Sequence, residues 1–144
     1  MKFEAKYFDE LTPRELYEIL RSRAEVFLLE QHIVCQDLDR VDYESLHCFL
    51  EEDGRILAYL RAFPTGDGAM QIGRVLSITH GVGHGKELMQ RSLAVIGEKS
   101  GCKSFTMHAQ SHAKGFYEKL GFVVCSPEFL EEGVPHVSMR LDLE

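Results

Sequence analysis

The stretch Gly81-Val82-Gly83-His84-Gly85 follows a strand-like run from Met70 to Ile78 and precedes a run with helical spacing that begins near Lys86. Glycines at alternate positions leave room for a ligand close to the main chain, and free N–H groups at a helix N-terminus attract anions. This order predicts an α/β protein that binds a phosphate-bearing ligand at the turn. A tight strand-to-helix turn without a ligand would also explain the glycines.

Two common nucleotide-binding patterns do not fit these glycines. A Walker-type loop needs glycine where His80 stands and Ser or Thr where Glu87 stands. The dinucleotide pattern Gly-x-Gly-x-x-Gly fails because Lys86 or Leu88 occupies its last position. What remains is the acyl-CoA-binding pattern Arg/Gln-x-x-Gly-x-Gly, which runs here from His80 to Gly85 with histidine at its first position.

Signals along the chain predict alternating helices and strands. Thr12-Pro13-Arg14-Glu15 combines an N-cap hydroxyl, a proline at the first helical position and a capping-box glutamate, so a helix is expected to run to about Glu30. Strands at 47–52 and 55–63 are expected to form a hairpin through Asp53-Gly54. The other expected elements are a strand at 70–78, a helix from 86 to Gly101, a strand at 104–109, a short helix at 112–120 and strands near 122–125 and 136–143.

This order indicates a mixed α/β sheet flanked by helices, with antiparallel strands early and parallel crossovers later. The apolar positions with helical spacing are expected to face the core; they are Leu16, Ile19, Leu20, Val26 and Phe27 in the first helix and Leu88, Met89, Leu93 and Ile96 in the next.

Length and composition limit the number of domains, the class of partner and the location of the protein. A chain of 144 residues fits one domain spanning 1–144. Its net charge of −7 disfavours a nucleic-acid partner, which needs clustered Lys and Arg, and favours a cationic one. The segment 1–7 alternates charged and apolar residues, and no apolar run is long enough for a membrane span, so a cytoplasmic protein is expected. The scattered Cys35, Cys48, Cys102 and Cys125 are expected to be free thiols.

A second motif follows the turn at Ala113–Phe122. This segment, AKGFYEKLGF, resembles the Ala-x-x-x-Tyr-Glu-Lys-x-Gly-Phe segment of the GCN5-related N-acetyltransferase (GNAT) superfamily. Further segments are similar to its ElaA-like branch, at 20–23, 26–27, 30–31, 36–39, 72–75, 109–112 and 135–136. The resemblance implies the GNAT acyl-CoA N-acyltransferase fold and direct transfer of an acetyl group from acetyl-CoA to an amine.

The resemblance also implies roles for individual residues. Tyr117 would act as the general acid for the departing thiolate, with Phe116 beside it in the core. Main-chain N–H groups of Gly81, Val82, Gly83, His84, Gly85 and Lys86 would bind the pyrophosphate, and Val75, Leu76 and Ser77 would pair with the pantetheine arm through their main chain. Gln110, where many members have Asn, would complete the cofactor site.

The sequence does not decide which residue acts as the general base. His47, Glu30, His108 and His136 are candidates, because a histidine or a tuned carboxylate can take the proton of an amine directly or through water. His136 and Glu30 come first because their segments resemble the family. Water alone could also accept the proton.

No metal site is expected. The pairs His80 with His84 and His108 with His112 have a spacing that suits zinc on a continuous helix. The first pair spans the glycine turn and the second a strand-to-helix junction, so neither pair shares one helix face.

The sequence leaves the acceptor undecided and allows one alternative function. A small amine, a polyamine and a protein amine all fit, and the carboxylates Glu25, Glu30, Asp37 and Asp39 favour a cationic one. A homodimer is compatible with a domain of this kind. The alternative function is a catalytically idle CoA-binding or regulatory module; Tyr117 favours the enzyme, whereas His80 and Gln110 depart from the family pattern.

Overall fold

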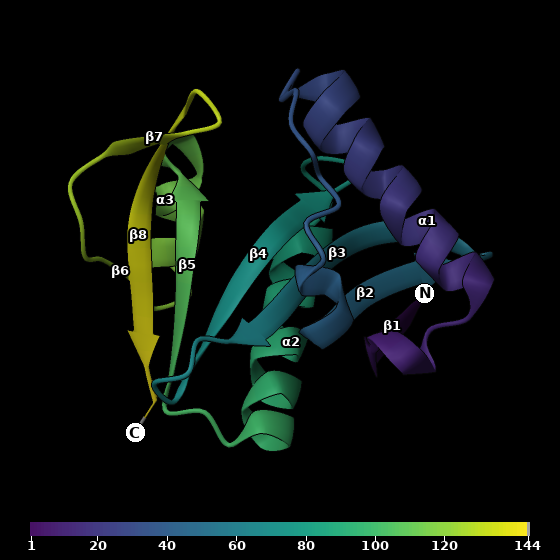
Figure 1. Cartoon of the computed structure of the whole chain (residues 1–144), viewed down its shortest axis with the longest axis horizontal. Helices are drawn as coiled ribbons and strands as arrows, with labels where there is room; N and C mark the ends of the chain where they lie inside the picture. Colours follow the sequence, from purple (N-terminus) through teal and green to yellow (C-terminus); the bar gives the residue numbers. More distant parts are fainter. Residues whose placement is uncertain (144) are drawn as a thin grey trace.

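One mixed sheet of eight strands organises the molecule, shown as a computed structural model that describes residues 1–143 (Figure 1). The path of the sheet is β1-β2-β3-β4-β5-β8-β6, and β7 pairs with β8. The strands are β1 (Lys2–Tyr7), β2 (Leu46–Glu52), β3 (Arg55–Pro64), β4 (Ala69–Ser77), β5 (Ser104–Gln110), β6 (Val123–Val124), β7 (Phe129–Glu131) and β8 (Val134–Asp142). The predicted mixed α/β sheet is therefore confirmed.

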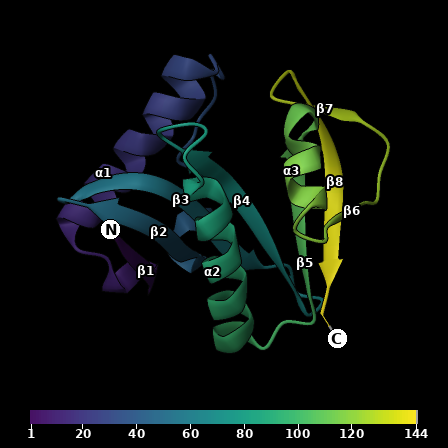
Figure 2. The same ribbon diagram turned by 180° about the vertical axis from the view of Figure 1, so that it is seen from behind.

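Helices cover both faces of the sheet. The first helix consists of α1 (Pro13–Arg23) and a π-helical continuation, η2 (Ala24–Glu30), and α2 (His84–Ser100) and α3 (Lys114–Glu118) lie on the opposite face (Figures 1 and 2). Short 3₁₀ turns are η1 (Phe8–Glu10), η3 (Val41–Glu44) and η4 (Ser111–Ala113). Among residues 1–143, no helix has the length and apolar character needed to cross a membrane.

Local signals explain where these elements begin and end. The Thr12 hydroxyl accepts a hydrogen bond from the Glu15 N–H at 3.1 Å, and the Glu15 carboxylate accepts one from the Thr12 N–H at 2.8 Å. This capping box confirms the predicted helix start. Asp53 and Gly54, at φ 53° and 77°, form the predicted hairpin turn, and Gly101, at φ 65°, ends α2 as predicted.

Alternation along the strands divides the core into two layers. Leu46, Cys48 and Leu50 of β2 join the cluster that contains Leu88 and Ile96 of α2. Between them, Phe49 belongs to the second cluster, which α1 and η2 close with Ile19 and Val26. Because helices cover both faces, most of β2 is buried. Of the positions predicted to face the core, those that are buried are Ile19, Val26, Leu88, Met89 and Ile96, and those that are half-buried are Leu16, Leu20, Phe27 and Leu93.

The sheet opens between β4 and β5. These strands are parallel, but they pair only from Ala69 to Ile72 against Ser104 to Met107, and beyond that point they diverge (Figure 1). A β-bulge follows on β4, where Arg74 has a φ of 54°. The expectation of several parallel crossovers was wrong: β4–β5 is the only parallel pair among the described strands, because β8 returns antiparallel to β5.

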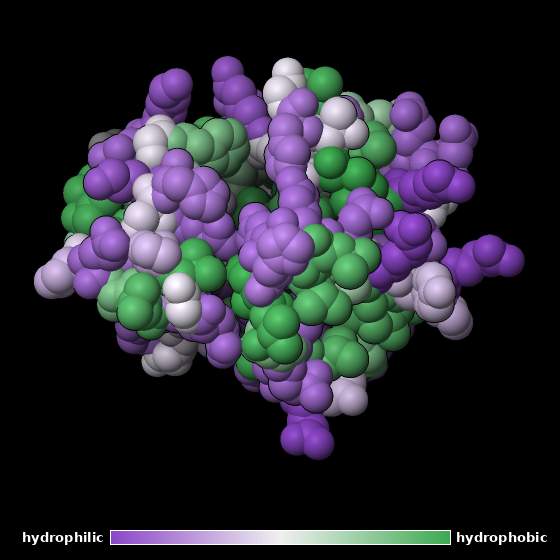
Figure 3. All heavy atoms as spheres, turned by 90° about the horizontal axis from the view of Figure 1, so that it is seen from above, coloured by the Kyte–Doolittle hydropathy of each residue, from purple (hydrophilic) through white to green (hydrophobic). Residues whose placement is uncertain are grey.

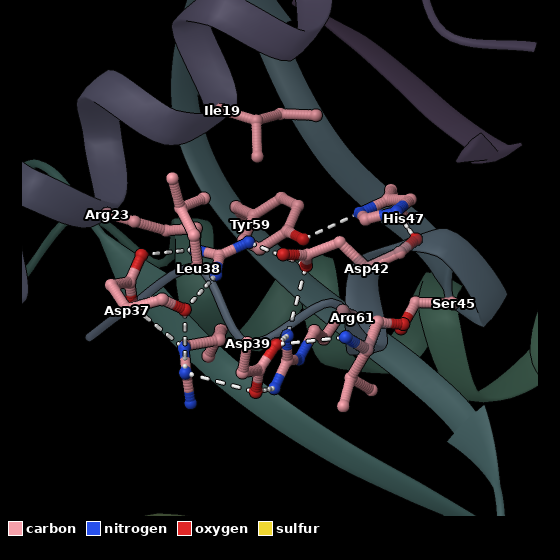
Figure 4. A network of polar contacts seen from close by, with 12 residues as sticks. Ile19, Arg23, Asp37, Leu38, Asp39, Asp42, Ser45, His47, Tyr59 and Arg61 are labelled. Carbon is pink, nitrogen blue, oxygen red and sulfur yellow. Dashed lines mark hydrogen bonds and ion pairs between the residues drawn. The ribbon is translucent and has the colours of Figure 1, made fainter. Parts of the chain in front are cut away.

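A buried ionic network fixes the segment 31–45 against the sheet (Figure 4). Arg23, at the end of α1, is 1% exposed. Its guanidinium donates to Asp37 Oδ2 at 2.9 Å, to Asp42 Oδ1 at 2.7 Å and to the Asp37 carbonyl at 3.0 Å. A buried charge is tolerated when it is paired and its donors are satisfied, and the Asp42 carboxylate supplies much of that pairing.

Two further arginines complete the network from β3 and β4. Arg61 donates to both carboxylate oxygens of Asp39, at 2.8 and 2.6 Å, and to Asp42 at 3.0 Å. Arg74, at the bulge, donates to Asp37 Oδ1 at 2.8 Å and to the Asp37 carbonyl at 3.0 Å. The same aspartates therefore join the first helix, the 31–45 segment and the bulged strand.

Removal of Arg23 should destabilise the fold strongly. Arg23→Met removes three hydrogen bonds of the buried network and leaves Asp42 with only Arg61, and the Asp37 carbonyl with only Arg74, as side-chain donors. The free energy of unfolding should therefore fall by about 3–5 kcal/mol in urea denaturation. Arg21→Met is the matched control, because Arg21 is exposed on the same helix and pairs only with Glu25. The control should change stability by less than about 0.5 kcal/mol. Equal effects of the two variants would contradict the role given to Arg23.

The network should also make stability depend on acid pH. Hydrogen bonds from Arg61 lower the pKa of Asp39 to about 2. Burial alone would raise the pKa of Asp42, but hydrogen bonds from Arg23 and Arg61 outweigh it and lower that pKa. Lowered folded-state pKa values add stability above the unfolded-state value of about 3.9, and this stability is lost as the pH falls towards about 2.

Urea denaturation at a series of pH values should therefore show stability falling between about pH 4 and pH 2. Asp39→Asn, which removes one of the titrating groups, should be less stable than the wild type at neutral pH and should lose less on acidification. An unchanged acid dependence in Asp39→Asn would count against this assignment.

Candidate active site

A cleft of about 570 Å³ lies where β4 and β5 diverge. Its walls come from the 31–41 segment, from β3 and β4 around Arg61 and Arg74, from β5 and α3, and from the turn between β7 and β8. Figure 3 views the molecule from above, the side towards which the two strands open in Figure 1, and shows polar and apolar side chains interspersed there. The cleft therefore brings together segments from both halves of the chain.

Tyr117 reaches the cleft from α3. Its ring is 7% exposed and makes edge contacts with Phe116 and Phe122, at centroid distances of 5.1 and 6.2 Å. Burial raises the pKa of the phenol, so the hydroxyl keeps its proton at neutral pH. This is the protonation state that a proton donor needs. Phe116, expected in the core, is instead 37% exposed and lies against Gly85 of the glycine turn.

His136 reaches the same cleft from β8 and is 7% exposed. Its Nδ1 lies 2.7 Å from the Val134 carbonyl oxygen. A carbonyl can only accept, so Nδ1 carries the hydrogen and Nε2 of the neutral ring is left with its lone pair. His136 can therefore accept a proton at Nε2.

His108 lies beside His136 on the neighbouring strand and also lines the cleft. The sheet pairs Gln110 with His136 and His108 with Ser138, so the two histidines are diagonal neighbours on one face. Glu131 of β7 contacts both imidazoles, at 2.8 Å from His108 Nδ1 and 3.6 Å from His136 Nε2. Glu131 was not singled out from the sequence, in which 128–136 reads as a loop.

Glu30 does not line the cleft. Its carboxylate is 2.7 Å from His80 Nε2, and both side chains are largely exposed. Next to it, Gln31 accepts a hydrogen bond from the Gln110 side chain at 2.9 Å, and both glutamines line the cleft. The end of η2 thus touches the glycine turn on one side and the end of β5 on the other.

His47 is not available as a base. It is fully buried, and its Nε2 donates to the Asp42 carbonyl at 2.9 Å while its Nδ1 accepts from the Tyr59 hydroxyl at 2.7 Å (Figure 4). Burial lowers its pKa, so the ring stays neutral. His47 orders the network beneath the 31–45 segment, and the sequence had no signal for that contact.

The glycine turn forms the N-terminus of α2, which begins at His84, two residues earlier than expected. Gly81 and Gly83 have φ values of 79° and 83°, and a Cβ on either would meet no atom within 4 Å. The first N–H groups of the helix therefore open onto free space that an anion can enter. Lys86 is exposed in the first turn of the same helix.

The three residues expected to pair with the pantetheine arm lie on β4 beside this turn. Val75 lines the cleft, whereas Leu76 is buried in the α1 layer and Ser77 is half-buried. All three follow the last residue of β4 that pairs with β5, and on the other side Leu76 and Ser77 pair with β3. The structure thus brings Val75, Gln110, Tyr117 and His136 into one cleft, with the glycine turn next to it and Glu30 outside it.

Most of the charge in the cleft is paired. Asp37 and Asp39, which the sequence suggested would attract an acceptor, bind Arg61 and Arg74. The other carboxylates that line the cleft are Glu131, which contacts the two histidines, and Glu132, at the turn between β7 and β8. Within residues 1–143, no three His, Cys, Asp or Glu side chains gather closely enough to hold a metal ion.

Comparison with known proteins decides the family. The Acetyltransferase (GNAT) domain matches residues 11–143. The chain belongs to the GNAT acetyltransferase family. Protein ElaA of Escherichia coli is 28% identical over 99% of this chain and 97% of its own length, and its crystal structure superposes with a TM-score of 0.90. The resemblance to the ElaA-like branch of GNAT is confirmed.

Two other similar proteins cover nearly the whole chain. A UPF0039 protein of Schizosaccharomyces pombe is 35% identical over 99% of this chain and 98% of its own length. The crystal structure of an acyl-CoA N-acyltransferase from Pseudomonas aeruginosa has a TM-score of 0.91 at 34% identity and covers 98% of this chain and 99% of its own. The GNAT fold and the enzyme class, an N-acyltransferase that uses an acyl-CoA, are thereby confirmed.

Proposed function

We propose that the chain transfers an acetyl group directly from acetyl-CoA to a cationic amine. The observation that carries this proposal is that a proton donor, Tyr117, and a proton acceptor, His136, line one cleft at the opening between β4 and β5. The amine must lose a proton and the thiolate must be stabilised, so aminolysis of a thioester needs one group of each kind.

The donor would enter through the open edge of the sheet. Its pyrophosphate would meet the N-terminus of α2, and its pantetheine amides would pair with the main chain of β4 beyond the bulge, like an added strand. Gln110 would exchange its hydrogen bond with Gln31 for one to the donor. The 34% identical acyl-CoA N-acyltransferase supports an acyl-CoA donor, and the acetyl group is the part that we propose.

The geometry favours His136 over Glu30 as the base. His136 is nearly buried in the cleft with Nε2 free to accept, whereas Glu30 lies outside the cleft and is engaged by His80. Tyr117 would donate to the departing sulfur from the opposite wall. The proposed transfer is direct: the amine attacks the thioester, and no cysteine takes the acetyl group in between.

A cationic acceptor is supported by the carboxylates of the β7–β8 turn. Asp37 and Asp39 are neutralised by arginines, so Glu131 and Glu132 give this cleft its acidic excess. Attraction between exposed charges is screened by salt, and the acceptor KM should rise with ionic strength if this excess guides binding.

The proposal is tested by incubating the protein with acetyl-CoA and each of putrescine, spermidine, lysine amide and benzylamine. Loss of the thioester absorbance is the direct readout, because the exposed Cys35 and Cys125 would react with a thiol reagent. Loss that depends on an amine is expected. CoA binding without any such loss would favour the idle CoA-binding module instead.

Tyr117→Phe should lower kcat while leaving CoA affinity nearly unchanged. The ring and its contacts with Phe116 and Phe122 remain, and only the proton donor is lost. General acid catalysis is typically worth about 10²–10⁴-fold, so a clear drop in kcat is expected in the thioester assay. A fully active Phe variant with the wild-type pH–rate profile would remove Tyr117 from the mechanism.

Gly83→Val should abolish CoA binding. In the wild type, CoA at about 100 times its Kd should stabilise the protein by about 2.7 kcal/mol, seen as a rise in Tm. The valine side chain would occupy the space proposed for the pyrophosphate. Gly54→Val is the matched control, because Gly54 has a similar φ of 77°, open surroundings and a place in the distant β2–β3 turn. An undiminished CoA-induced rise in Gly83→Val would show that the turn is only structural.

A further inference from the structure

The side chains of Glu131, His108 and His136 form a connected cluster on one wall of the cleft, and each comes from a different strand. Phe129 holds the two imidazoles: its ring meets His108 edge-on at 5.3 Å and stacks on His136 at 6.2 Å with an interplanar angle of 25°. The register of β7 places Phe129 opposite His136. The rings therefore have fixed positions relative to Glu131.

Hydrogen-bond chemistry sets the protonation of this cluster. An ionised carboxylate can only accept, so His108 Nδ1 carries a hydrogen and donates it to Glu131 Oε1 at 2.8 Å. The other oxygen, Oε2, lies 3.6 Å from His136 Nε2. Nδ1 of His136 carries the hydrogen that binds the Val134 carbonyl. Nε2 of the same ring therefore has no hydrogen to donate while the ring is neutral.

The gap of 3.6 Å thus separates two acceptors in the resting state. When His136 takes a proton at Nε2, the same nitrogen becomes a donor that faces a carboxylate. A contraction of less than about 1 Å would give a charge-assisted hydrogen bond of ordinary length. An interaction that forms only as the proton moves stabilises the transition state more than the ground state and raises kcat.

We infer that Glu131 is a positioning residue that compensates the charge of His136 as it removes the proton of the amine, and that His108 orients Glu131 for this task. The inference rests on the proposed role of His136 as the base. The cationic acceptor first loses one proton to water, which gives its nitrogen a lone pair. As this nitrogen bonds to the thioester carbonyl carbon, its second proton moves to His136 Nε2, the carbon–sulfur bond breaks and the sulfur takes the proton of Tyr117. The proton on His136 then returns to the Tyr117 oxygen through water. Glu131 and His108 exchange no proton with the substrate.

The kinetic test compares Glu131→Gln with Glu128→Gln in the thioester assay, with acetyl-CoA and the panel amine that the wild type uses fastest. Glu128 is exposed just before β7 and does not line the cleft, so its variant removes the same charge without the histidine contacts. A charge-assisted hydrogen bond corresponds to about a 10- to 100-fold loss of kcat in Glu131→Gln, with the KM for acetyl-CoA nearly unchanged. Glu128→Gln should keep the wild-type kcat.

Double variants separate this role from a merely structural one. His108→Gln should lower kcat less than Glu131→Gln does, and combining the two should cost no more than Glu131→Gln alone, because His108 acts through Glu131. In a His136→Gln background, Glu131→Gln should add no further loss. A rise in acceptor KM at constant kcat would assign Glu131 to amine binding instead, and additive losses would overturn the coupling.

A measurement without turnover keeps the inference testable if no amine reacts. In proton NMR spectra recorded over a series of pH values, the protonated form of His136 should show a low-field imidazole N–H signal from the Nε2 hydrogen held by Glu131. This signal should persist in Glu128→Gln and disappear both in Glu131→Gln and in His136→Gln, and the loss in His136→Gln separates it from the His108 N–H that also binds Glu131. Its absence from the wild type would overturn the inference whatever the enzyme does. An inactive wild type that shows the signal, or a His136→Gln variant that keeps full kcat, would instead count against the proposed function.

Discussion

The contact between buried Arg23 and the carboxylates of Asp42 and Asp37 is the interaction that holds the 31–45 segment, and with it one wall of the cleft, in place. Burying a guanidinium is costly unless all its donors are satisfied, and the aspartates of the 31–45 segment satisfy them. That requirement holds an irregular segment, whose Val34, Leu38 and Tyr43 are exposed rather than packed in the core, against the end of α1 and against β3. The same segment forms one wall of the cleft, so the shape of the cleft is tied to the stability of the fold.

The network also reaches the place where the sheet opens. Arg74 sits at the bulge of β4 with a φ of 54°, a conformation that is costly for a residue with a side chain, and Asp37 holds its guanidinium there. Beyond the bulge, β4 no longer pairs with β5, and its free main chain faces the opening. One set of ionic contacts therefore supports both the 31–45 wall of the cleft and the strand edge proposed to bind the donor.

The features that the sequence predicted well are local. The capping box at Thr12, the Asp53-Gly54 hairpin and the glycine turn each depend on a few consecutive residues, whose chemistry determines their conformation. The ionic network could not be predicted in this way, because Asp37 and Asp39 find their partners 14 to 37 residues away. For the same reason β1 and β7 were not expected. In β1, charged residues alternate with apolar ones, and the segment forms a strand through its pairing with β2. The strand β7 is short and leads into a turn at Glu132 and Gly133. The motif around Tyr117 could be recognised because it is contiguous, whereas the proposed role of Glu131 depends on residues from two other strands.

The two walls of the cleft offer different surroundings for the charges that acyl transfer creates. Tyr117 packs within the main core, where burial raises the pKa of its phenol and keeps it neutral until a thiolate forms beside it. On the opposite wall, Glu131 and His108 are more than two-fifths exposed while His136 is nearly buried between them and the sheet. A proton taken by His136 would thus produce a cation that a carboxylate and nearby water can stabilise. The buried surroundings of Tyr117 suit a neutral acid, which the departing sulfur needs. The more exposed, acidic surroundings of His136 suit a cation, which forms when the attacking amine loses a proton. The Glu131 carboxylate, which would stabilise the protonated His136, also lies where a positively charged acceptor would arrive. Glu131 can therefore bind the protonated His136 only after the amine has lost its positive charge and no longer competes for this carboxylate.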